Sequence, residues 1–298
     1  MPTYSIRHVT TYRYAFPVAF GEHRLMLRAR DSQDQRTLSA RLSITPHPQA
    51  LSWSEDPAGN PVGRARFGTR ARELRFEAAM EVEVVPLELP LAASARGAAT
   101  NIAELAPFTA RQHADPDGAV ERWARAIRAE DGDGDALGFL TRLSARIRQD
   151  FTYRPRLEKG IQSPVRTLRL GSGSCRDFAV LMGEGVRALG FASRFASGYL
   201  HVPGQGPDSA TLGGHTHAWT QVHVPGIGWV DFDPTCGSVG NRDLVRVALV
   251  RDPEQAAPLS GSYIGYPDDF IDMRVEVTVE RAGDFAAPGP VGRKPQAA

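Results

Sequence analysis

The sequence predicts an α+β protein, because stretches with strand-like and helix-like patterns follow one another as separate blocks. Residues 1–85 alternate between apolar and polar side chains, which is typical of β-strands. Apolar residues at helical spacing then recur up to Leu189, and strand-like alternation returns from Ser193 onward. Blocks of this kind favour helices segregated to one side of antiparallel sheets.

The first 85 residues predict an antiparallel β-sandwich-like domain. Its clearest strand runs from Leu74 to Val84, where apolar side chains at even positions alternate with mostly charged ones. A similar alternation starts at Tyr4, and the DPAGNP segment at residues 56–61 has turn chemistry between two strands. We therefore expect residues 1–85 to form a β-rich N-terminal domain.

The rest of the chain is predicted to comprise a linker, a second domain and a tail. Pro, Leu and Ala dominate residues 86–98, which we interpret as the linker, and residues 99–285 then form the second domain. Residues 286–298 are mostly Pro, Ala and Gly and are expected to be disordered. A Gly-, Pro- and Ser-rich loop is expected over residues 203–214.

Within the second domain, apolar spacing predicts helices around residues 120–127 and 140–147. The acidic, glycine-containing segment that starts at Asp131 resembles a calcium loop, but Ala136 and Arg142 occupy its sixth and twelfth positions. A loop that caps the second helix is the better interpretation. A polar loop is expected after Pro155, followed by a helix that starts at a cysteine.

Composition favours an ordinary globular protein. The 298 residues carry 35 basic and 34 acidic side chains, so the net charge of +1 gives no reason to expect nucleic acid or an anionic membrane as a partner. The chain contains no apolar run near the roughly 18 residues of a membrane span and no signal-peptide pattern at its start. Two cysteines do not make a disulfide framework. The expected compartment is the cytoplasm.

Cys175 is the first candidate for chemistry, since it opens an apolar helix after a run of glycines and serines. A thiol at a helix N-terminus is favoured as a thiolate by the helix dipole. Unpaired backbone N–H groups at the same place can bind an oxyanion. The alternative is a small cysteine buried in the core.

A base and a carboxylate follow, and spacing alone leaves both choices open. His215, His217 and His223 have the same parity around one predicted strand, so any of them could face a thiol. Asp231 and Asp233 share a face of the next strand, and Pro234 holds Asp233 in extended backbone. The alternatives are an ordinary strand histidine and an Asp-Pro turn.

A zinc site is the competing interpretation of these residues. The soft ligands that could contribute to such a site are His215, His217, His223, Cys175 and Cys236. However, the chain has neither a Cys-x-x-Cys nor a His-Glu-x-x-His pair, so we expect no metal and no cofactor. A disulfide between the two cysteines is equally disfavoured in a reducing compartment.

Three segments together resemble the transglutaminase-like superfamily of bacteria: GSCRDFA around Cys175, HAW from His217, and GWVDFDPT around Asp233. The resemblance implies a papain-like core, in which the cysteine helix packs on an antiparallel sheet. It also implies that Cys175 is the nucleophile, His217 the base and Asp233 the residue that orients the imidazole. YSIRHVTTYRY from Tyr4 resembles the β-rich N-terminal region that is fused to such domains.

The resemblance implies a cysteine amide or peptide hydrolase, or an acyltransferase, that works through a thioester. Its substrate would be a protein or peptide, with an amine as a second partner if the acyl group is transferred. Tyr153, Ser174 and Trp219 are further candidates for substrate or oxyanion contacts, with core packing as the alternative for Tyr153 and Trp219. The second hypothesis is a non-catalytic binding or scaffold module that keeps the fold.

Overall fold

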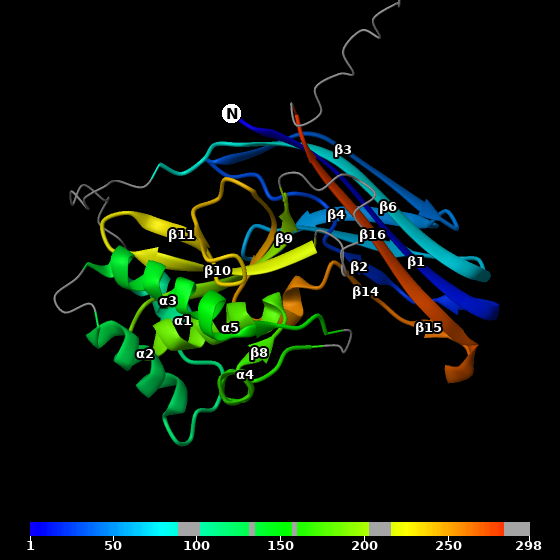
Figure 1. Cartoon of the computed structure of the whole chain (residues 1–298). Coiled ribbons are helices and arrows are strands. Elements are labelled where there is room, and N and C mark those ends of the chain that lie inside the picture. The colour runs from blue at the N-terminus through cyan, green and yellow to red at the C-terminus, as the bar shows by residue number, and fades with distance from the viewer. Residues whose placement is uncertain (89–101, 131–134, 157–159, 203–215, 283–298) are drawn as a thin grey trace, which may run out of the picture.

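The computed structural model describes residues 1–88, 102–130, 135–156, 160–202 and 216–282. Helices gather on one side of the molecule and long antiparallel strands on the other, as Figure 1 shows, so the predicted α+β class is confirmed. Most of the predicted linker, loop 203–214, His215 and the tail from residue 286 lie outside the described residues. No described helix has the length and apolar character needed to cross a membrane.

The N-terminal strands form two antiparallel sheets that pack face to face. The first contains, in order, β15 (Tyr263–Ile264), β1 (Thr3–Phe20), β6 (Ala71–Val84) and β3 (Gln35–Thr45), with β16 (Phe270–Arg281) also paired to β1. The second contains β14 (Leu259–Ser260), β2 (His23–Leu25), β5 (Pro61–Arg66) and β4 (Ala50–Glu55). Apolar side chains from both sheets, Leu25 and Phe76 among them, share one core, which confirms the sandwich-like prediction.

Three strands of this sandwich come from the C-terminal part of the chain. β16 pairs with β1 from Tyr4↔Arg281 to Tyr14↔Phe270, and β14 and β15 pair with β2 and β1. Residues 259–281 were grouped with the second domain by the predicted boundaries, yet they hydrogen-bond to strands of residues 1–85. Alternation identifies a strand but not its partner, because pairing is a non-local choice.

The second part of the molecule is an antiparallel sheet covered by helices on one face (Figure 1). Its strands, in order, are β12 (Ser238–Val239), β11 (Gly228–Asp233), β10 (Thr216–Val224), β9 (Ser193–Leu200) and β13 (Leu244–Val250). The helices are α1 (Ile102–Thr109), α2 (Ala119–Ala129), α3 (Ala136–Asp150), α4 (Pro164–Leu170) and α5 (Cys175–Ala188), with a 3₁₀ turn at Pro253–Ala256. A second 3₁₀ turn, at Pro267–Asp269, contacts β1 of the sandwich.

Helix α5 is the buried centre of this part. Phe178, Leu181 and Val186 pack against Val222 and Phe232 of the sheet, and the Thr220 hydroxyl donates to the Ala179 carbonyl at 2.6 Å. The cysteine helix on an antiparallel sheet is therefore confirmed. Asp135 caps α3 by accepting from the Gly138 N–H at 2.6 Å, whereas residues 131–134 of the calcium-like segment lie outside the described residues.

The predicted polar loop between Pro155 and the cysteine is wrong in part, because it contains α4. Ser163 caps this helix by accepting from the Arg166 N–H, Pro164 occupies its first turn, and Gly171 ends it in the left-handed region at φ 57°. These are recognised start and stop signals, but a helix of seven residues offers too few turns for apolar periodicity to reveal it.

The sandwich and the helix-covered sheet meet along β13. The side-chain amide of Gln35 accepts from the Arg246 N–H at 2.7 Å and donates to the Arg246 carbonyl at 2.9 Å. Asn60 forms the same two bonds with the backbone of Leu249, at 2.9 and 3.0 Å. Two amide side chains thus bond to backbone groups on the outer edge of β13, where the Arg246 carbonyl also accepts from the Arg30 N–H at 2.9 Å.

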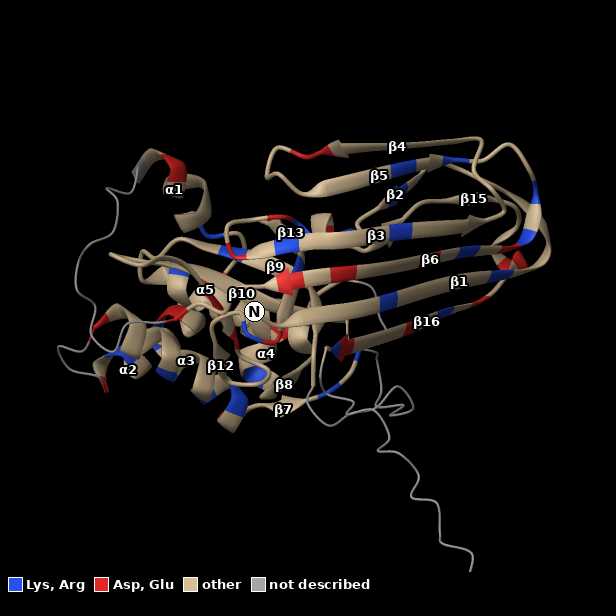
Figure 2. Cartoon of the chain, turned by 90° about the horizontal axis from the view of Figure 1, so that it is seen from above, with Lys and Arg blue, Asp and Glu red and all other residues tan. Residues whose placement is uncertain are grey.

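Charged side chains are distributed over both parts. Figure 2 shows basic and acidic positions interspersed along the long strands of the sandwich. Several of them pair across strands, for example Arg7 with Glu77 at 2.7 Å and Arg36 with Glu83 at 3.2 Å. This interspersed pattern agrees with the near-neutral net charge.

Candidate active site

The first turn of α5 holds Cys175 in place through a buried carboxylate. Asp177 is fully buried and accepts from the N–H and the hydroxyl of Ser174, both at 2.8 Å. It also accepts from the Gln162 N–H at 2.7 Å and from Nε of Arg156 at 2.9 Å. A buried carboxylate with this many donors is fixed in position, so the residues on both sides of Cys175 are fixed as well.

Gly173 is required for the chain to approach the helix. A Cβ at this position would lie 2.8 Å from Cβ of Asp177, closer than real side chains come. The Gly173 carbonyl also accepts from the Arg154 N–H at 2.8 Å, in the short parallel pairing of β7 (Thr152–Tyr153) with β8 (Ser172–Gly173). This pairing places Tyr153 beside the cysteine segment.

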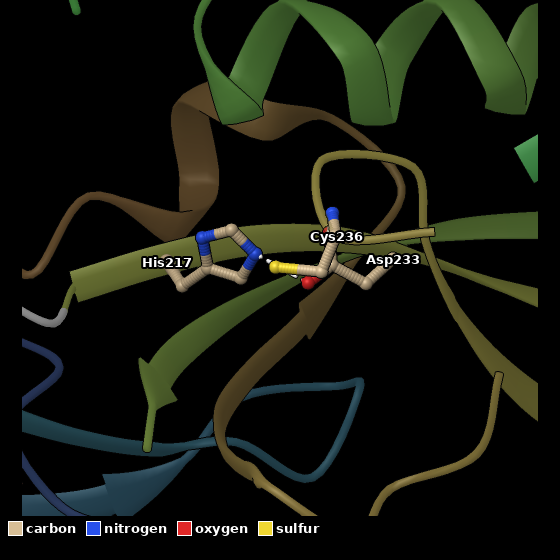
Figure 3. Close-up of side chains that lie close together, drawn as sticks. All are labelled: His217, Asp233 and Cys236. Atoms are coloured by element: carbon tan, nitrogen blue, oxygen red, sulfur yellow. Dashed lines mark hydrogen bonds and ion pairs between the residues drawn. The ribbon is translucent and has the colours of Figure 1, made fainter. Parts of the chain in front are cut away.

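His217 and Asp233 come from neighbouring strands, β10 and β11, and meet at one end of the sheet (Figure 3). Nε2 of His217 lies 2.8 Å from Oδ2 of Asp233, and both residues are buried. The other carboxylate oxygen accepts from the N–H of Thr235 at 2.9 Å and of Cys236 at 3.4 Å. Asp233 therefore opens a turn and also accepts from the imidazole. The Asp-Pro turn and the orienting carboxylate, which the sequence left as alternatives, are both present at this residue.

Cys175 lies close to the His217 ring and to the Ala218 N–H, and both stabilise its thiolate. Because Nε2 faces Asp233, Nδ1 is the ring nitrogen left to exchange a proton with the sulfur. The structure thus brings Cys175, His217 and Asp233 together. These are the residues that the resemblance singled out.

The three ionisable groups shift each other's pKa values. Burial by itself would raise the pKa of Cys175, but the hydrogen bond and positive charge of His217 and the Ala218 N–H outweigh it, so the pKa is lowered. Burial would lower the pKa of His217, but the charge and hydrogen bond of Asp233 raise it well above its ordinary value. The pKa of Asp233 is lowered, since its interactions with His217 exceed the effect of burial. All three directions favour a thiolate, an imidazolium and a carboxylate.

Asp231 binds different partners from Asp233, although the spacing in the sequence could not distinguish the two aspartates. Its carboxylate accepts from Nε1 of Trp219 at 2.6 Å and from Nε2 of Gln221 at 2.8 Å. Trp219 is fully buried, and its ring lies nearly parallel to that of His217, with centroids 6.1 Å apart and 20° between the planes. Asp231 thus holds the indole that backs the imidazole.

The other histidines do not join the site among the described residues. His223 lies at the far end of β10, where its ring meets Trp229 edge-on at 5.5 Å, and His215 lies outside the described residues. The zinc ligand set weighed from the sequence is therefore not assembled in the described part of the chain. Both cysteines are free thiols, so they form no disulfide with each other.

A smaller set of metal-ligand groups does come together. Ligand atoms of His217, Asp233 and Cys236 all lie within 4.8 Å of one another (Figure 3). Cys236 is exposed, whereas the other two residues are buried. His217 and Cys236 were among the soft ligands considered from the sequence, but Asp233 was not, because the turn that returns Cys236 to Asp233 cannot be read from spacing alone.

Tyr153 and Ser174 lie next to the thiol. The Tyr153 hydroxyl is within hydrogen-bonding reach of Cys175, and its ring meets Phe178 edge-on at 6.3 Å. Burial and the charge of Cys175 raise the pKa of Tyr153 to about 12. The Ser174 hydroxyl donates to Asp177. Asp177 was not among the predicted site residues, although Ser174 followed by an acidic residue three positions on is a capping-box signal.

A helix that starts at a cysteine, packed on a sheet that carries a histidine and an aspartate, defines the papain-like class of cysteine enzymes. Residues 121–234 match the transglutaminase-like superfamily, and residues 4–83 match the bacterial transglutaminase-like N-terminal region. The family and the fold support a general cysteine-type hydrolase or transglutaminase-like function.

Relatives resemble the chain over most of its length. Uncharacterized proteins of Mycobacterium tuberculosis and Mycobacterium bovis are 29% identical over 295 residues, which is 92% of this chain and 92% of theirs. The crystal structure of a candidate cysteine protease from Cytophaga hutchinsonii matches with a TM-score of 0.67 and 20% identity, over 93% of this chain and 90% of that one. That structure shares the fold.

Proposed function

We propose that the chain is a cysteine amidase, peptidase or acyltransferase in which Cys175, His217 and Asp233 act as nucleophile, base and orienting carboxylate. One observation carries the proposal. The imidazole of His217 lies between the thiol of Cys175 and the buried carboxylate of Asp233, with 2.8 Å between Nε2 and Oδ2. That order of groups is what thiol-dependent acyl transfer requires.

The reaction begins with the Cys175 thiolate attacking the carbonyl carbon of a carboxamide or peptide bond. The carbonyl electron pair moves to the oxygen, and the tetrahedral intermediate collapses when His217 protonates the departing amine. A thioester remains on the sulfur. Neutral His217 then takes a proton from water or from an acceptor amine, which attacks the thioester and releases the thiolate. Water gives hydrolysis, and an amine gives acyl transfer.

The oxyanion would form at the N-terminus of α5, where backbone N–H groups lack helical acceptors. The Cys175 N–H is the first donor in this proposal. Among the three further candidates, Ser174 and Trp219 donate to carboxylates, at 2.8 and 2.6 Å. We assign the second donor to Tyr153, whose hydroxyl lies within hydrogen-bonding reach of Cys175 and is protonated at neutral pH, as tyrosine ordinarily is. One lost donor of this kind costs roughly 3 kcal/mol in the barrier.

The proposed substrate is a protein or peptide that supplies the amide, with an amine as second substrate if acyl transfer prevails. Neither nucleic acid nor a membrane enters the proposal, and the cytoplasm stays the predicted compartment. The non-catalytic scaffold remains the competing hypothesis, and it requires that Cys175 show no acyl chemistry.

The test uses an acyl-donor peptide library with a biotinylated primary amine in water, and mass spectrometry reads the products. We expect a thioester-linked adduct on Cys175, followed by release to water, to the amine or to both. Cys175→Ala should form no adduct and Cys236→Ser should still form one. If the wild-type protein forms no adduct on Cys175 with any library member or with an acyl-thiol probe, the scaffold hypothesis replaces the enzyme.

A further inference from the structure

Cys236 gives the site a second thiol on the carboxylate side of His217. It follows Asp233 by three residues, in a turn where the Gly237 N–H donates to the Asp233 carbonyl at 2.7 Å and Gly237 has a φ of 73°. The turn brings the Cys236 sulfur, a ring nitrogen of His217 and a carboxylate oxygen of Asp233 within 4.8 Å of one another (Figure 3). The proposed reaction makes no use of this sulfur.

We propose that His217, Asp233 and Cys236 bind a thiophilic divalent cation of the Zn²⁺ type, and that the bound ion keeps the enzyme inactive. The inhibitory half of this proposal rests on the proposed function, whereas the binding half stands on the geometry alone. The ion would take the place of the hydrogen bond between Nε2 of His217 and Asp233.

The donor set selects the kind of ion. One nitrogen, one carboxylate oxygen and one sulfur suit Zn²⁺ and similar borderline ions, whereas Mg²⁺ and Ca²⁺ prefer oxygen ligands. Bond lengths of about 2.0–2.3 Å to zinc place tetrahedral ligands roughly 3.2–3.8 Å apart. The present spread of up to 4.8 Å must therefore close by about 1 Å at its widest. Cys236 is exposed and lies in a turn, so its side chain can make this move, and water can fill the fourth position.

Binding of the ion and catalysis exclude each other for a chemical reason. The ion replaces two protons, one on Nε2 of His217 and one on the Cys236 thiol, and both leave to solvent. The imidazole bound through Nε2 keeps a single proton, on Nδ1. Giving that proton to the departing amine would leave an imidazolate, whereas the metal-free imidazolium becomes a neutral imidazole, so the ion disfavours the acid step of the reaction. Asp233 is also withdrawn from its hydrogen bond. Cys175 lies on the Nδ1 side of the ring and is not a ligand in this proposal.

Binding can be measured without any assay of activity. Co²⁺ added to the full, chelator-treated chain should give a thiolate-to-metal charge-transfer band with a stoichiometry of one, and Zn²⁺ should displace it. Cys236→Ser should lose the band, whereas Cys175→Ser should keep it. Circular dichroism of each variant, recorded before the metal is added, establishes that the fold is intact.

The outcomes separate the two halves of the proposal. Absence of the band in the wild-type protein, or a band lost in Cys175→Ser and kept in Cys236→Ser, overturns the binding site. A band that forms while Zn²⁺ leaves acyl-adduct formation unchanged overturns the inhibitory role alone. If the chelator-treated wild-type protein binds Co²⁺ as expected but, without added metal, forms no acyl adduct, the proposed function fails while the metal site stands.

Discussion

Two segments each place a thiol beside His217 and Asp233, and the pKa values of the two thiols are shifted in opposite directions. At the N-terminus of α5, burial opposes the ionisation of Cys175, but His217 outweighs it and the pKa is lowered. In the turn after β11, the residue Cys236 is exposed as a whole, but desolvation of its sulfur and the negative charge of Asp233 act together and raise the pKa of the thiol to about 12. The two thiols therefore differ because His217 favours ionisation of Cys175, whereas desolvation and Asp233 oppose ionisation of Cys236.

Removal of each sulfur in turn is the strongest test of this comparison. Cys175→Ala should lower kcat/KM by at least about a thousandfold, because the nucleophile is lost. Cys236→Ser should cost less than about tenfold, since a hydroxyl can replace the thiol beside Asp233. Steady-state kinetics on the best substrate of the library, with a chelator present, measures both. Equal losses in the two variants would contradict the assignment of Cys175.

Asp233→Asn removes the negative charge that acts on both thiols. We expect the rate of the reaction at Cys175 to fall and the reactivity of Cys236 to rise. The rate should fall by about a hundredfold to ten-thousandfold, because the imidazole loses its orienting carboxylate. The pKa of Cys236 should fall, because Asp233 helps to raise it. Alkylation of Cys236 by iodoacetamide, followed by peptide mass spectrometry, should become faster in this variant. Asp231→Asn is the matched control and should leave the labelling of Cys236 unchanged.

The pH profile follows from the same shifts. The thiolate–imidazolium pair exists between the lowered pKa of Cys175 and the raised pKa of His217. Activity should therefore rise with pH through the first pKa and fall through the second. In Asp233→Asn the alkaline limb should move to lower pH, because Asp233 raises the pKa of His217. An alkaline limb that stays in place would show that another group controls it.

Tyr153→Phe should lower the rate of the reaction less than Asp233→Asn does, and it should leave the reactivity of Cys236 unchanged. Loss of one oxyanion donor is expected to lower kcat by about a hundredfold with little change in KM. Single-turnover acylation measured by rapid quench would locate the loss in the chemical step. If KM rises and kcat stays constant, Tyr153 contacts the substrate and does not donate to the oxyanion.

The smallest expected effect on kcat comes from the residues that support Trp219, the indole next to the His217 ring. Arg246 on β13 pairs with Asp34 of the sandwich at 2.5 Å and with Asp231, which holds Trp219, at 3.5 Å. Asp34→Asn weakens the first pair, and kcat should fall by less than about tenfold through the support of Trp219. Indole fluorescence should report the change at Trp219. Asp34→Glu keeps the negative charge and should retain more of the rate than Asp34→Asn, which a general loss of stability would not predict.

Much of the fold could be read from local patterns, because α2, α3, α5 and the strands from β9 to β11 follow apolar periodicity. The short helix α4 could not, since seven residues carry too little periodic signal. The choice of His217 and Asp233 needed the resemblance to a family, because parity put His223 and Asp231 on equal terms with them. The structure separates these residues by their partners, Trp229 for His223 and Trp219 for Asp231.

The pairing of β16 with β1 has a consequence for how the chain is made. β1 leaves the ribosome first and β6 soon after, but the other neighbour of β1 is not synthesised until residues 270–281. The nascent sandwich must therefore wait with one edge of its central strand open while the helices and the second sheet emerge. A fragment cut after residue 85 would keep that open edge and is expected to self-associate.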